Sequence, residues 1–84
     1  MISPSRKAKI TWQCRRGMLE LDLILTRFID NELDNLSTEQ LHAFESLLTT
    51  SDPVLYDWLM GRDTPTDKEC SLIVAFIKRH DNAG

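Results

Sequence analysis

Apolar residues recur along this chain at spacings of three and four, and no stretch alternates between apolar and polar positions at a period of two. That spacing predicts amphipathic helices, because residues three and four apart lie on one face of a helix. The pattern therefore predicts an all-α fold, a small five-helix bundle with short loops. The first two helices run from about Ser5 to Arg15 and from about Met18 to Leu33; the third follows Ser37, the fourth lies between Asp52 and Gly61, and the last follows Thr66.

The second predicted helix has an apolar stripe that faces the core. At about 3.6 residues per turn, the stripe is formed by Met18, Leu21, Ile24, Leu25, Phe28 and Ile29. The opposite side carries Leu19 and Leu23 among charged residues, which is unusual for a face expected to lie in solvent. Either these two leucines form a docking patch, or the first helix or the chain ends cover them. The pattern leaves both interpretations open.

Several loops carry signals for the start or end of a helix. Ser37 and Gln40 fit a capping box, in which each side chain bonds the other residue's backbone N–H. Asp52 is expected to cap the fourth helix, and Thr66 to open a second capping box before the last one. Gly61 is expected to end the fourth helix, since glycine readily adopts the left-handed conformation that terminates helices.

The composition is that of an ordinary globular protein, with 84 residues of which 42% are hydrophobic and 27% charged. This length predicts one helical domain over residues 1–84. No apolar run approaches the about 20 residues that span a membrane, and the first sixteen residues lack the apolar segment of a cleavable leader. We therefore expect a cytoplasmic protein in which Cys14 and Cys70 are reduced thiols rather than a disulfide.

Charge is unevenly distributed along the chain. The net charge is −3, yet residues 1–16 contain five bases and no acid, and all 13 acids lie from Glu20 onward. A basic arm on an acidic body suits docking onto a protein with a mixed or acidic surface. The acids would repel phosphate, which argues against a dedicated nucleic-acid binder. A DNA-binding regulator stays as a distant alternative for a short helical chain.

No set of residues in the sequence forms a catalytic constellation, so we predict that the protein is not an enzyme. His42 and His80 lie far apart without metal-ligand spacing, and the three glycines are scattered rather than gathered in a phosphate-binding loop. We expect neither a bound metal nor a bound cofactor. Neighbouring arginines can lower the pKa of the Cys14 thiol, but no second catalytic group accompanies it.

The sharpest feature of the chain is the group Arg16, Gly17 and Glu20. Gly17 is the only glycine in the first 60 residues and marks the break between two helices, where a missing side chain lets the backbone approach another surface closely. Arg16 and Glu20 are four residues apart, so on a continuous helix they would share a face. The pattern fits either a contact site or an intrahelical ion pair beside a glycine hinge.

Two blocks of the sequence resemble signatures of the SdhE family, also called succinate dehydrogenase assembly factor 2. Residues 16–20, Arg-Gly-Met-Leu-Glu, match the family's RGxxE motif within a run that is similar to W-x-C-R-R-G-M-x-E-L-D. Residues 52–59 resemble the family's second signature, D-P-x-L-x-x-W-L. The two blocks, their order and the chain length make the resemblance cover nearly the whole chain.

This resemblance implies a small helical bundle that helps attach FAD covalently to the flavoprotein subunit of succinate dehydrogenase, and in bacteria to that of fumarate reductase. The FAD belongs to this client, whose acceptor histidine and flavin ring the factor would hold in a reactive arrangement. An antitoxin-like partner that neutralises an inner-membrane protein is an alternative role proposed for some family members. With the apolar patch included, the predicted contact residues are Trp12, Arg15, Arg16, Gly17, Leu19, Glu20, Asp22 and Leu23.

Overall fold

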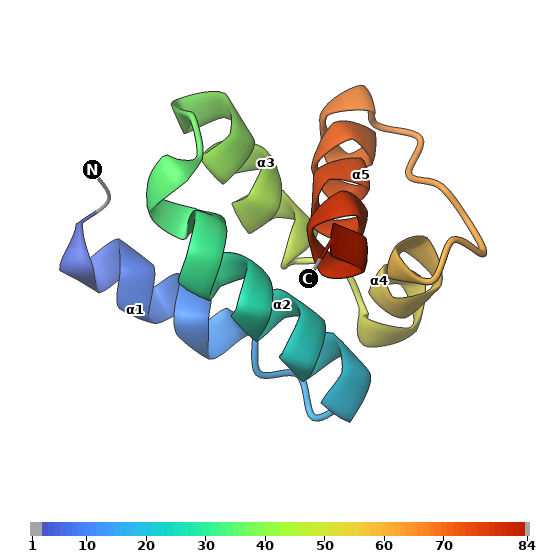
Figure 1. Ribbon diagram of the computed structural model, residues 1–84, viewed down its shortest axis with the longest axis horizontal. Helices are drawn as coiled ribbons and strands as arrows, with labels where there is room; N and C mark the ends of the chain where they lie inside the picture. Colours follow the sequence, from blue (N-terminus) through green and yellow to red (C-terminus); the bar gives the residue numbers. More distant parts are fainter. Residues whose placement is uncertain (1–2, 84) are drawn as a thin grey trace.

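A computed structural model describes residues 3–83 of the chain, and the side chains of residues 3–81. Within that range the chain forms five α-helices, one short 3-10 helix and no strand, which confirms the predicted all-α bundle. The elements are α1 (Pro4–Gln13), α2 (Leu19–Glu32), η1 (Leu33–Asn35), α3 (Thr38–Leu47), α4 (Asp52–Leu59) and α5 (Lys68–Ala83). Helix α5 packs against α2, α3 and α4, and α1 lies on the side of the bundle away from α5 (Figure 1).

Two of the predicted helix boundaries are confirmed by their hydrogen bonds. Ser37 Oγ accepts from the N–H of Gln40 at 3.1 Å, and Gln40 Oε1 accepts from the N–H of Ser37 at 2.9 Å, so the capping box before α3 is complete. Gly61 follows the end of α4 with a φ of +78°, a conformation that glycine adopts without steric cost.

Three boundaries differ from the sequence prediction. Asp52 is the first residue of α4 rather than its cap, and the preceding Ser51 has the extended backbone of the cap position. Before α5 the cap is Asp67 in place of Thr66, since Asp67 Oδ1 accepts from the N–H of Glu69 at 3.1 Å. Helix α2 ends at Glu32, and the chain then tightens into η1, which buries Leu33.

The core is built from the predicted apolar stripe of α2 and the inward faces of the other helices. Leu21, Leu25 and Phe28 of this stripe are completely buried. The ring of Phe28 lies 5.4 Å from that of Phe44 on α3 and 5.3 Å, edge to face, from that of Phe76 on α5, between ring centroids. Aromatic contacts of this geometry add to the burial of apolar area, so the Phe28 ring joins α2 to both α3 and α5.

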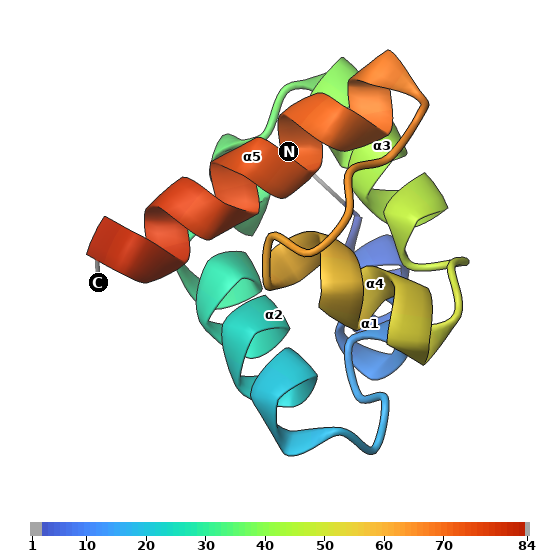
Figure 2. The same ribbon diagram turned by 90° about the vertical axis from the view of Figure 1, so that its right-hand side faces the viewer.

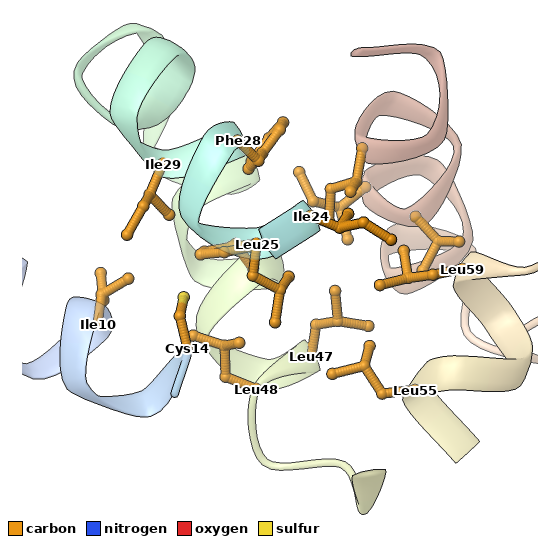
Figure 3. Packing of buried hydrophobic residues seen from close by; sticks show 14 of the residues in the cluster. Ile10, Cys14, Ile24, Leu25, Phe28, Ile29, Leu47, Leu48, Leu55 and Leu59 are labelled. Atoms are coloured by element: carbon orange, nitrogen blue, oxygen red, sulfur yellow. The ribbon is translucent and has the colours of Figure 1, made fainter. Parts of the chain in front are cut away.

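The end of α1 is anchored in the same core. Ile10 is the one buried residue within α1, and Cys14 directly after the helix is buried as well. Figure 3 shows the Cys14 side chain pointing into the bundle between Ile10 and Leu48, with Leu25 of α2 opposite. The buried residues of this short helix lie toward its C-terminal end, and Cys14 leads directly into the loop before α2.

Candidate functional site

The group Arg16, Gly17 and Glu20 lies where α1 gives way to α2. Residues 15–18 form a loop between the helices, which we call the contact loop, and Gly17 in it has a φ of +83°. L-residues rarely adopt this conformation, so the turn favours glycine at this position. No atom beyond the neighbouring residues lies within 4 Å of the place where a Cβ on Gly17 would stand. The backbone there faces open space.

Of the two interpretations of this group, the intrahelical ion pair between Arg16 and Glu20 is wrong. Helix α2 begins only at Leu19, and the positive φ of Gly17 turns the chain between the two charged residues. The four-residue spacing therefore does not place them on a common helical face, because that argument needs continuous helical backbone. Each of the two side chains has found a partner on another element instead.

The guanidinium of Arg16 is directed into the molecule and is only 13% exposed. Its Nε donates to Asp52 Oδ1 at 2.5 Å, in the first turn of α4. Its Nη1 donates to the carbonyl oxygens of Leu48 at 2.7 Å and Gln13 at 3.2 Å, and its Nη2 to that of Thr50 at 2.6 Å. A cation at the end of α3 satisfies carbonyls that the helix leaves without partners and opposes the negative end of its dipole. Arg16 thus ties α1, α3 and α4 together.

Two further bonds set the first turns of α2. Asp22 Oδ1 accepts from the backbone N–H of Arg16 at 2.7 Å, which closes the contact loop. Glu20 is exposed, and its Oε2 accepts from the Tyr56 hydroxyl on α4 at 3.1 Å. This hydrogen bond to a carboxylate raises the pKa of the Tyr56 hydroxyl above its ordinary value. In Figure 2 the contact loop leaves α1 near α4 and turns below the bundle into α2.

The remaining predicted contact residues point outward. Trp12 is 74% exposed, Leu19 73% and Leu23 50%, and Arg15 is exposed beside them in the sequence. Within residues 3–81, neither α1 nor the C-terminal helix buries Leu19 and Leu23, so the interpretation that this part of the chain covers them is wrong. Trp12 and Arg15 line a shallow hollow along the outer side of α1. Large apolar side chains left in solvent are typical of interaction surfaces.

Cys14 lies next to this surface but takes no part in it. Burial raises the pKa of its thiol to about 12, and the nearby Arg16 charge offsets only a smaller share of that effect. The possibility that this thiol has a lowered pKa is therefore wrong, because burial outweighs the effect of the Arg16 charge. Cys14 and Cys70 are both free, as the sequence predicted. A neutral, buried thiol is a packing residue.

Sequence reasoning missed the residues that hold the site from the other side. Asp52 and Tyr56 lie 36 positions from Arg16 and Glu20 respectively, and nothing local in the sequence links them. Their spacing of four did carry a signal, since it places a carboxylate and a phenol on one face of α4. The two blocks that resemble family signatures, around residues 16–20 and at residues 52–59, therefore lie next to each other in the folded chain.

The described residues contain no group of three or more His, Cys, Asp or Glu side chains arranged to hold a metal ion. Over the same part of the chain, no helix has the length and apolar character needed to cross a membrane.

Comparison with known proteins identifies the family. A family model described as "Flavinator of succinate dehydrogenase" (Sdh5) matches residues 8–81. The chain belongs to this family. The FAD assembly factor SdhE of Legionella pneumophila (strain Lens) is 56% identical over 75 residues, which cover 89% of this chain and 94% of that protein. The SdhE of Coxiella burnetii is 43% identical over 79 residues, covering 94% and 96%.

A solved structure supports the same assignment. The solution structure of a UPF0350 protein matches with a TM-score of 0.84 and 35% identity, and the alignment covers 99% of this chain and 88% of that one. The predicted membership of the SdhE family is confirmed. Both blocks fall inside the region that the flavinator model matches.

Proposed function

We propose that this chain is a cytoplasmic FAD assembly factor that promotes covalent attachment of FAD to the flavoprotein subunit of succinate dehydrogenase. Membership of the flavinator family supports this proposal, and so do the names of the relatives with 40% to 56% identity. The flavoprotein subunit of fumarate reductase, which resembles it in chemistry, is proposed as a second client. The chain acts as a chaperone and not as an enzyme in its own right.

The proposed docking surface consists of Gly17, Leu19, Glu20 and Leu23, which we call the contact face. The observation that carries this proposal is the open backbone at Gly17 followed by two exposed leucines one turn apart. Glu20 between them supplies a charge that fixes the orientation of a partner more than its affinity. Trp12 and Arg15 extend the surface along α1. Arg16 in the contact loop and Asp22 in the first turn of α2 complete the site.

The chemistry in this proposal is supplied by the client and its flavin. Holding the acceptor histidine and the flavin ring in a reactive arrangement lowers a barrier through orientation alone, by up to roughly 7–11 kcal/mol in well-aligned systems. A factor that binds one client conformation better than others also raises the population of that conformation. Neither effect requires FAD to be bound by this chain, whose scattered glycines offer no phosphate-binding loop.

The test is covalent flavin on the client, scored by in-gel fluorescence after co-expression in cells that lack their own factor. Gly17→Arg is expected to abolish the flavin signal, because a long charged side chain then projects from the contact face. Gly17→Ala is the matched control, since it carries the same backbone strain at positive φ without the bulk. It is expected to melt like Gly17→Arg and to retain most of the flavinylation.

Full flavinylation by Gly17→Arg would contradict the proposed contact face. Co-purification of the tagged protein from its native cells distinguishes the assembly factor from the antitoxin-like alternative. Recovery of a flavoprotein subunit supports the assembly factor, whereas recovery of a small membrane protein alone would favour the antitoxin-like role.

A further inference from the structure

Helix α4 contacts both charged positions of the RGxxE motif. Asp52 binds Arg16 and Tyr56 binds Glu20, and these two residues of α4 are four apart on one helical face. Arg16 and Glu20 themselves lie on different elements, one in the contact loop and one in the first turn of α2. Their relative placement therefore depends on α4 rather than on a shared helix.

We propose that Asp52 and Tyr56 are positioning residues, which hold the contact loop and the first turn of α2 in the one arrangement that the partner recognises. The inference rests on the proposed function, in that the partner is taken to be the flavoprotein subunit of succinate dehydrogenase. It assigns Arg16 a role within the protein: its guanidinium shapes the contact face from behind, and Gly17 and Glu20 meet the partner.

The hydrogen bonds of Arg16 support this division of roles. Its guanidinium makes four of them, three to backbone carbonyls and one to Asp52, all on this chain. An arginine has five N–H donors in a rigid fork, so few are left for a partner. Turning the side chain outward would leave a carboxylate and three carbonyl oxygens without their donor, which is costly where they are partly buried.

The contact loop is fixed on both sides of its glycine. Before Gly17, the backbone N–H of Arg16 is bound by Asp22 and the guanidinium by α3 and α4. After it, Glu20 is bound by Tyr56. A turn held at both ends loses less conformational freedom when a partner binds, and affinity rises for that reason.

Tyr56 is itself held in place. The guanidinium carbon of Arg62 lies 5.6 Å from the centroid of the Tyr56 ring, a cation–π arrangement that restricts the ring. Its hydroxyl engages Glu20 Oε2 from the side of α4 and leaves the exposed Glu20 side chain on the contact face. The phenol thus fixes the direction of a carboxylate that a partner is to recognise.

The decisive experiment is a double-mutant cycle on the affinity for the FAD-free flavoprotein subunit, measured by isothermal titration calorimetry with the full chain. Asp52→Asn is expected to weaken binding about tenfold, since it removes the carboxylate charge that holds the Arg16 guanidinium. Arg16→Gln should weaken binding as well, and the double variant should be little weaker than either single one. Asp52→Glu, which keeps the carboxylate, should recover part of the affinity.

A different result is expected if Arg16 contacts the partner directly. Asp52→Asn would then release the Arg16 side chain, and the affinity for the flavoprotein subunit would stay unchanged or rise. That result, or additive effects of the two substitutions, would overturn the proposal. Glu45→Gln is the matched control, because it breaks an arginine–carboxylate pair between Arg6 and α3. It should leave the affinity unchanged.

Tyr56→Phe tests the second positioning residue with a variant that removes only a hydroxyl. It is expected to weaken binding several-fold in the wild-type background, and not at all when Glu20 is already replaced by Gln, because the two groups act through one bond. If Tyr56→Phe in the wild-type background bound the subunit with unchanged affinity, Tyr56 would not be a positioning residue.

A measurement without the client separates this inference from the proposed function. Amide hydrogen exchange by NMR should be faster at Arg16 and Asp22, whose N–H groups bond to Asp22 Oδ1 and to the carbonyl oxygen of Met18, in Asp52→Asn than in the wild type or in Glu45→Gln. If the wild-type chain failed to bind the flavoprotein subunit, the proposed function would be wrong, and unchanged exchange at these amides would overturn the positioning role by itself.

Discussion

Two arginines at opposite ends of α1 use the same side chain in different ways. Arg6, in the first turn, is 41% exposed and binds one carboxylate, that of Glu45 on α3, with its Nε 3.0 Å from Glu45 Oε2. Arg16, just beyond the end of the helix, is 13% exposed and binds Asp52 and three backbone carbonyls. The Arg6 bond joins two side chains on the surface, whereas Arg16 joins α1, α3 and α4 through three backbone carbonyls and one carboxylate.

The difference shows which charged contact the fold needs. Surface ion pairs contribute little, because solvent screens them and two long side chains must be ordered to make them. Carbonyl oxygens at a helix end have no alternative donor once they are shielded from water, so the residue that serves them is hard to replace. Arg16 is therefore expected to contribute more to the stability of the fold than Arg6.

The largest effect is expected for Arg16→Ala, with a loss of roughly 2–4 kcal/mol in the free energy of unfolding. The substitution leaves the Asp52 carboxylate and the carbonyl oxygens of α3 without their donor. Urea denaturation followed by circular dichroism measures it. A loss well below about 1 kcal/mol would mean that Arg16 behaves as an ordinary surface residue.

Asp52→Asn is expected to have the next largest effect, roughly 1–2 kcal/mol. The amide oxygen still accepts from Arg16 Nε, but the opposite charge is gone and the carbonyl contacts of Arg16 remain. The same urea titration gives the value. A loss as large as that of Arg16→Ala would show that the carboxylate, not the carbonyls, carries the stability.

Arg6→Ala should lower the melting temperature less than either of these substitutions. Its partner Glu45 stays partly exposed to water when the arginine is removed, so no charge is left shielded without a partner. Thermal melting at low and at high salt is the measurement, and the small effect should shrink further in high salt. A drop equal to that of Arg16→Ala would contradict the contrast between the two arginines.

The smallest expected effect is a pH dependence from the Arg6–Glu45 pair. The hydrogen bond from Arg6 holds the pKa of the Glu45 carboxyl below its ordinary range. A group whose pKa is lower in the folded state stabilises the protein above its unfolded pKa, about 4.3, and loses that contribution as the pH falls through its folded pKa. The difference in melting temperature between wild type and Glu45→Gln should therefore narrow below about pH 4. A difference that stayed constant down to pH 3 would rule out this linkage.

Local sequence signals predicted what depends on neighbouring residues. The five helices, the capping box at Ser37 and the chain break at Gly17 all follow from residues a few positions apart. The pairing of Arg16 could not be predicted in this way. A glycine with positive φ redirects the chain, and the partner Asp52 comes next to Arg16 only through the packing of the whole bundle. The same packing buries Cys14 and raises the pKa of its thiol, which the neighbouring arginines alone did not suggest.

The sequence pattern grouped the candidate residues, and the structure divides them into exposed side chains and side chains that bond within the chain. Exposed Leu19 and Leu23 were recognised because they break the polar face of an amphipathic helix, a local pattern. Asp22 and Arg16 were grouped with them, yet both make intramolecular bonds that shape the contact loop. Spacing identifies which residues lie near each other along a helix, whereas hydrogen bonds between elements depend on the folded structure.

The most direct test of the contact face is an NMR titration of the isotope-labelled chain with the FAD-free flavoprotein subunit of succinate dehydrogenase. We expect the amide signals of Gly17, Leu19 and Glu20 to lose intensity at the lowest concentrations of the subunit, and that of Leu23 to follow. The groove between α3 and α5, lined by Leu72, Phe76 and Arg79, should respond last. Early loss of signal in that groove, with the signals of the contact face unchanged, would contradict the proposed contact face.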